Sequence, residues 1–189
     1  RELLYKTASE LRIPVVFSAP LGMSGTLHVF TPDAMSFSDY FDIRDEMPYF
    51  DKLAAFAVGL APAAIHIKYM DMRYVSLKDH AGPSVASACS IASGLLTTEV
   101  LILLLNLRIG QKAPKFVQFD AFRMKYRTGK LRWGNRGPLQ WLKRQIGYRM
   151  FRSMGQKARP MEQTDEDIGN DIERIISHAR WAPSGDNTQ

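Results

Sequence analysis

The 189-residue sequence contains a single cysteine, Cys89. One cysteine excludes a disulfide within the chain and any zinc site built from several cysteines. The sequence also has no glycine-rich phosphate loop, because Gly22 and Gly25 lie in a predicted hairpin turn and not between a strand and a helix. No Ser/His/Asp set is suggested by spacing. These residues alone therefore do not reveal a catalytic site.

Acidic residues are absent from residues 121–160, which contain twelve lysines and arginines. The net charge is +6, so the rest of the chain is net acidic. This distribution indicates a basic segment on an acidic body and not a basic domain. No signal peptide is visible, no methionine starts the sequence, and both ends are abrupt, so we expect a piece of a longer protein.

The longest apolar run, residues 84–105, lies between Pro83 and Gly110. Proline suits the first turn of a helix and glycine suits its left-handed end. The run therefore predicts one helix of about 26 residues, buried against a sheet, with Cys89 as a small core side chain and only secondarily as a nucleophile. The run is also long enough to span a membrane, but Glu99 near its middle would be costly at bilayer depth.

Shorter elements flank this helix on both sides. The patterns of apolar residues predict helices over 1–12, 50–60 and 63–70, strands over 13–19, 26–30, 115–120 and 123–127, and a turn at 128–130. Residues 36–47 are acidic and aromatic, which favours a solvated loop, with a partner or substrate surface as the alternative. His66 is expected to be an ordinary packed or half-exposed histidine. The order of elements indicates an α/β fold.

Residues 134–163 form a predicted domain boundary, in which apolar residues recur at roughly helical spacing among basic ones. Three interpretations stay open: a linker helix that packs on its own protein, an interfacial membrane helix, and a nucleic-acid contact. A last helix is predicted to begin at Thr164, a suitable N-cap residue, and its acidic first turn suits the positive helix end. Its apolar stripe consists of Ile168, Ile172, Ile175, Ile176 and Ala179.

Several of these segments resemble, in order, the C-terminal half of the ThiF-like adenylyltransferase domain, the fold shared with ubiquitin-activating enzymes. The matching segments are the helix and strand of 1–16, the Gly-containing hairpin 20–30, the Gly-Pro-led helix with Glu99, and the strands around Phe119-Asp120. The resemblance implies a Rossmann-like α/β half with a mixed sheet and the long buried helix.

This resemblance also implies a chemistry. Members of that family bind ATP and magnesium and adenylate a C-terminal carboxylate, usually on a small β-grasp protein. Their nucleotide loop and metal-binding Asp would lie before Arg1, and Arg1 itself would match an arginine near the nucleotide. Two features depart from the pattern. Residues 36–81 contain no cysteine for a thioester step, and the paired CxxC zinc motifs are missing.

Residues 175–189 resemble the start of the nitroreductase family, in which a similar Ala-Arg-Trp-Ala-Pro-Ser segment runs from a helix into the flavin loop. The resemblance implies that Pro183, Ser184, Asn187 and Gln189 would lie at FMN. The Arg-Ser pair that holds the FMN phosphate in many members is not visible. A piece that ends at Gln189 is therefore not expected to hold FMN by itself.

Together the two resemblances imply a ThiF-like domain over 1–133, a basic linker over 134–163 and the first helix of an α+β nitroreductase domain over 164–189. The implied protein is a cytoplasmic homodimeric enzyme. It would couple ATP-dependent adenylation of a carboxylate, on a small carrier protein or peptide, to FMN-dependent oxidoreduction. One alternative is a non-catalytic ThiF-like module that docks a partner for the flavin domain, and another is a membrane-tethered protein. Nucleic acid and membrane are not the expected partners.

Overall fold

The computed structural model describes residues 2–70, 84–107 and 110–154. Within these ranges, four strands form one sheet in the order β1-β2-β3-β4. The strands are β1 (Val15–Leu21), β2 (Ser24–Phe30), β3 (Lys115–Asp120) and β4 (Lys125–Lys130). Every neighbouring pair is antiparallel, so the predicted mixed sheet is wrong for the described part of the chain. The strands predicted at 13–19 and 115–120 correspond to β1 and β3. Both pair with β2 and therefore lie in the same sheet.

The predicted hairpin of β1 and β2 is confirmed. Its two-residue turn is Gly22-Met23, between the paired residues Leu21 and Ser24. Gly22 has a φ of 60°, a conformation that the first position of this turn class demands and that glycine adopts without strain.

The second hairpin differs from the prediction. Residues 128–130 are not a turn but part of β4, and the chain turns at 121–124. Gly129 lies opposite Phe116, and a Cβ on Gly129 would come within 2.6 Å of that ring. The glycine that suggested a turn therefore makes room for an aromatic side chain.

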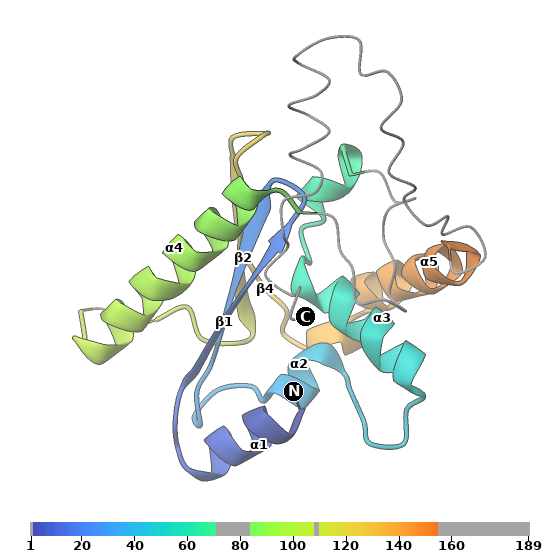
Figure 1. The fold of residues 1–189 in the computed structure, drawn as a ribbon. Coiled ribbons are helices and arrows are strands. Elements are labelled where there is room, and N and C mark those ends of the chain that lie inside the picture. The colour runs from blue at the N-terminus through green and yellow to red at the C-terminus, as the bar shows by residue number, and fades with distance from the viewer. Residues whose placement is uncertain (1, 71–83, 108–109, 155–189) are drawn as a thin grey trace, which may run out of the picture.

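One face of the sheet packs on α2 (Phe37–Phe41) and α3 (Tyr49–Leu60), and the aromatic core lies between them (Figure 1). Helix α3 confirms the predicted helix at 50–60. The solvated loop predicted at 36–47 is wrong, because Phe37, Tyr40 and Phe41 are buried in α2. Asp39 points to solvent from the same short helix, which explains why an acidic and aromatic sequence is nevertheless part of the core.

Helix α4 (Ala86–Leu104) lies across β1 and β2 on the opposite face of the sheet (Figure 1). The predicted helix that packs on a sheet is confirmed, but its predicted length of about 26 residues and its predicted burial are wrong. The helix has 19 residues, and of these only Ala88, Ala92 and Glu99 are buried. Leu104 is 76% exposed, because the sheet covers only one side of a helix that is apolar all round. Cys89 is half-buried and not a core residue.

By length and composition, α4 is the one helix in the described ranges that could cross a membrane, with a mean hydropathy of 1.7. Such a helix also occurs in soluble proteins, where it is mostly buried, but here only 22% of the apolar window is buried. The structure therefore leaves an extended apolar surface on α4 to be explained.

Two further predictions concern shorter helices. Helix α1 (Glu2–Glu10) confirms the helix predicted at the start of the chain. The helix predicted at 63–70 is only the single 3-10 turn η1 (Ile65–Lys68). His66 in that turn is buried, as expected for a packed histidine.

Helix α5 (Pro138–Met154) follows the short turn η3 (Gly134–Arg136) and packs against α3. The side-chain amide of Asn135 donates to the carbonyls of Phe41 and Ala55 at 3.0 and 2.8 Å. Three interpretations of this basic segment were open. The structure shows the contact that the first of them predicted, because the helix packs on its own protein. The domain boundaries at 133 and 163 stay predictions, and 155–163 lies outside the described residues.

Candidate functional site

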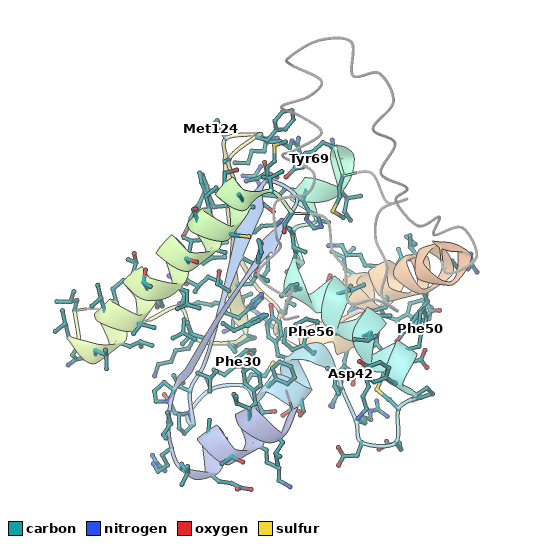
Figure 2. The ribbon with its side chains drawn as sticks, viewed as in Figure 1. Phe30, Asp42, Phe50, Phe56, Tyr69 and Met124 are labelled. Atoms are coloured by element: carbon teal, nitrogen blue, oxygen red, sulfur yellow. The ribbon has the colours of Figure 1, made fainter. Side chains whose placement is uncertain are left out.

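A cluster of polar side chains lies at the end of the sheet that carries the β1–β2 turn. Its members come from β2, β3, η1 and the β3–β4 turn. They are Ser24, His66, Tyr69, Gln118, Asp120 and Arg123, hereafter the polar cluster. Figure 2 labels Tyr69 at this end of the molecule, with Phe30 toward the other end. Strand alternation explains the grouping, since Ser24 pairs with Asp120 and Thr26 pairs with Gln118 on one sheet face.

Asp120 is the centre of this cluster and is fully buried. One of its carboxylate oxygens accepts a hydrogen bond from the Tyr69 hydroxyl at 2.8 Å. The other accepts from the backbone N–H of Arg123, also at 2.8 Å. The Tyr69 hydroxyl in turn accepts from the backbone N–H of Met23 at 3.0 Å. One phenol and one carboxylate therefore join both hairpin turns to the segment that follows η1.

His66 is held as a neutral acceptor beside this carboxylate. The Gln118 side chain donates to its Nδ1 at 3.0 Å, which leaves the ring proton on Nε2. Burial lowers the pKa of His66 to about 4, although the charge of Asp120 acts in the opposite direction. Burial also raises the pKa of Tyr69 to about 12, so the phenol keeps its proton at neutral pH and can donate to Asp120.

The polar cluster stands where the chain leaves the described residues at 70 and re-enters them at 84. A Cβ on Gly22 would lie 2.9 Å from the Tyr69 ring, so Tyr69 packs directly on the β1–β2 turn. On the other side, Ser84 forms a bridge with Gly22, and the backbone N–H of Val85 donates to the Gly22 carbonyl at 3.1 Å. Both attachment points of residues 71–83 thus lie at one turn.

A second buried histidine, His28, lies farther along the same face of β2. Its Nε2 donates to the carbonyl of Leu60 at 2.9 Å, and its ring lies 5.3 Å from that of Tyr40. Burial lowers the pKa of His28 to about 4, against the opposing effect of the Leu60 hydrogen bond. The sequence analysis predicted this strand only as half of a hairpin. The polar face of the strand could have been recognised, because Ser24, Thr26 and His28 alternate along an otherwise apolar strand.

The described residues do not offer a magnesium site. Within them, no group of three or more His, Cys, Asp and Glu side chains could hold a metal ion. Asp120 already uses both oxygens, for Tyr69 and Arg123. These side chains therefore do not form a metal site. They hold the backbone of the two hairpin turns in place.

The five predicted ligand-binding residues all lie outside the described residues. They are Arg1 for the nucleotide and Pro183, Ser184, Asn187 and Gln189 for FMN. The structure does not describe the positions of these five residues, so their binding roles stay predictions. The polar cluster was not predicted, because its members are separated by up to 99 residues and meet only through strand pairing.

Comparison with known protein families gives a match to this chain. The protein-family model described as the ThiF family matches residues 1–137. The matched range includes all four strands, α1 to α4 and every member of the polar cluster. No curated protein matches the chain.

Proposed function

The chain belongs to the ThiF family, and from this premise we propose that it forms the C-terminal half of a domain that adenylates a carboxylate on a small protein or peptide. The family suggests adenylyltransferase-type activity, and its domains typically bind ATP and magnesium. In the reaction, a carboxylate oxygen attacks the α-phosphorus of ATP as the bond to pyrophosphate breaks. The product is an acyl adenylate, whose AMP is a good leaving group for a later nucleophile.

The observation that carries this proposal is the family match over residues 1–137, which is most of the chain. Within the matched range, the role of the described residues is positional. The polar cluster and the Gly22 contacts of Ser84 and Val85 anchor residues 71–83 at both ends of that segment.

The test is exchange of labelled pyrophosphate into ATP by the full-length protein. Exchange that depends on added carboxylate supports adenylation, because the reaction reverses through the acyl adenylate. No exchange with any candidate carboxylate would instead favour a non-catalytic docking module. Residues 36–81 contain no cysteine, so neither proposal includes a thioester step in that segment.

We also propose coupling to flavin chemistry, which is supported only by the resemblance of residues 175–189 to the start of the nitroreductase family. Under this proposal Pro183, Ser184, Asn187 and Gln189 contact FMN in the longer protein. A yellow full-length preparation that releases FMN on denaturation would support it. A colourless preparation that takes up no FMN would contradict it and would leave the adenylation proposal intact.

A cytoplasmic homodimer is the proposed state of the protein, and α4 offers a specific reason to test it. Its exposed leucines need a cover, which a second subunit or a membrane could supply. Sedimentation of the detergent-free protein and flotation with vesicles distinguish the two. A soluble dimer supports the proposal, whereas recovery only with membranes would favour the membrane-tethered alternative.

A further inference from the structure

Helix α5 faces the protein with polar side chains and leaves large apolar side chains in solvent. The side chains that face the body are Gln140, Lys143, Arg144 and Tyr148, at the helical spacing of one face. Each is hydrogen-bonded. Gln140 donates to Asn135 at 3.3 Å, and Lys143 donates to the carbonyl of Pro62 at 2.6 Å. Arg144 pairs with Asp42, and the Tyr148 hydroxyl donates to the carbonyl of Asp51 at 3.3 Å.

Three large apolar residues lie together on another side of α5. They are Leu139, Leu142 and Ile146, which form a stripe at the spacing i, i+3, i+7, and each is at least half exposed. Trp141 is also exposed, but it lies near Tyr148 around the helix and not on this stripe. A surface helix normally buries such a stripe and leaves its charged residues in water. The inverted arrangement indicates that a second element covers this face.

We propose that residues 164–179 of the same chain cover the outward face of α5. These residues lie outside the described part of the structure. Their sequence has the charge and the apolar pattern that fit this face of α5. The five acidic residues between 164 and 173 meet no lysine or arginine there, whereas 121–160 has no acidic residue. The apolar stripe that includes Ile172 and Ile176 would face Leu142 and Ile146.

The length of the connection permits this contact. The nine residues 155–163 can span about 30 Å when extended, which exceeds the distance between two packed helices. The second helix would run antiparallel to α5, with Ile172 beside Ile146 and Ile176 beside Leu142. Because the segment is tethered, its effective concentration at α5 is in the millimolar range, so modest contacts suffice.

A pair of engineered cysteines tests the contact in the full chain. In a Cys89→Ser background, Ile146→Cys with Ile172→Cys is expected to form a disulfide within one chain on mild oxidation. The matched control pairs Ile172→Cys with Thr97→Cys, an exposed position on α4 across the sheet. We expect about tenfold more cross-linked monomer for the α5 pair, since both pairs are tethered in one chain but only the α5 pair would be held in contact by the proposed packing. Equal yields would overturn the proposal.

Tryptophan quenching gives a second measurement that needs no cysteine. In a full chain with Trp133→Phe, Trp141→Phe and Trp181→Phe, Leu142→Trp places a single reporter on the stripe, and Ile172→Asp is expected to raise its quenching by acrylamide. The matched control is Asn170→Asp, which adds the same charge on the opposite side of the predicted helix. The proposal fails if both variants act alike. It also fails if the reporter is shielded only at high protein concentration or only by anionic vesicles, which would identify a second copy or a membrane as the cover.

Discussion

The hydroxyl of Tyr69 donates a hydrogen bond to the carboxylate of Asp120 at 2.8 Å, across 51 residues of sequence. The same hydroxyl accepts from the backbone of Met23. Three parts of the chain therefore meet at one oxygen atom: the β1–β2 turn, the end of β3 and the segment that follows η1. This junction holds the chain just before residue 71.

Tyr69→Phe removes this oxygen and leaves Asp120 buried with one partner fewer. We expect a loss of about 1–3 kcal/mol in the free energy of unfolding, since a buried acceptor loses its donor. Urea unfolding measures it. Tyr126→Phe is the matched control, because Tyr126 is mostly exposed, and it should change the stability by no more than about 0.5 kcal/mol. Equal effects of the two substitutions would show that the Tyr69 hydroxyl carries no special role.

Acid should destabilise the fold through its two buried histidines, His28 and His66. The pKa values of His28 and His66 are lowered by burial from 6.5 to about 4. Between these values the unfolded chain binds more protons than the folded one, so stability is full above pH 6.5 and falls as the pH drops toward 4. Each histidine contributes a slope of about 1.4 kcal/mol per pH unit within that window.

Urea unfolding at several pH values between 7 and 4 measures this slope. His28→Gln cannot charge, so it should reduce the slope by the share of one histidine, whatever its effect on the stability at pH 7. An unchanged slope in the variant would mean that His28 does not titrate in the folded protein as described. The comparison of slopes remains informative even where the variant is less stable.

Asp42 joins α2 to η3 and α5. Burial opposes its ionisation, but the hydrogen bonds and charges of Arg136 and Arg144 outweigh burial and lower the pKa of Asp42. Asp42→Asn leaves Arg144, whose side chain is 12% exposed, without its counter-charge. We expect a loss of about 2–4 kcal/mol in the free energy of unfolding and looser docking of α5.

The control for this prediction is Asp33→Asn, which removes an exposed partner of Lys112. An exposed ion pair contributes little, so its loss should barely change the stability. Amide hydrogen exchange in α5 provides the local measurement. Faster exchange in the Asp42 variant alone is expected, and unchanged exchange in both variants would contradict the role assigned to Asp42.

Two glycines should respond to alanine in opposite directions. Gly134 has a φ of 55°, and a Cβ there would lie 2.7 Å from the carbonyl oxygen of Tyr40. Gly134→Ala should therefore cost at least about 1 kcal/mol. Gly94 lies in α4 with open space around it, so Gly94→Ala should stabilise the helix by about 0.5–1 kcal/mol. Thermal unfolding of both variants checks the signs, and a stable Gly134 variant would contradict the tight approach.

The sequence predicted the strands and the first hairpin because their signals are local. Alternation along β2 and a glycine at position 22 are both readable within a few residues. It predicted the helix α4 but not its exposure, because a helix that is apolar all round contains no information on which side a sheet covers. It failed for α2 because acidic neighbours obscured three buried aromatic residues.

The polar cluster could not be predicted for a different reason. Ser24 and Asp120 are neighbours only because β2 and β3 pair in one particular register, and a shift of β3 by one residue would turn Asp120 to the opposite face from Ser24. Tyr69 reaches Asp120 from a short turn whose position the periodicity did not indicate. Long-range register, and not residue type, assembles this cluster.

Exchange of labelled pyrophosphate into ATP, measured on the full-length protein, tests the central proposal most directly. The account predicts exchange that depends on a protein or peptide with a free C-terminal carboxylate, and weaker exchange in Tyr69→Phe than in Tyr126→Phe, because only the former loosens the anchor of residues 71–83. The absence of exchange with every carboxylate tested, in a protein that is folded and binds its partner, would contradict adenylation and identify a docking module instead.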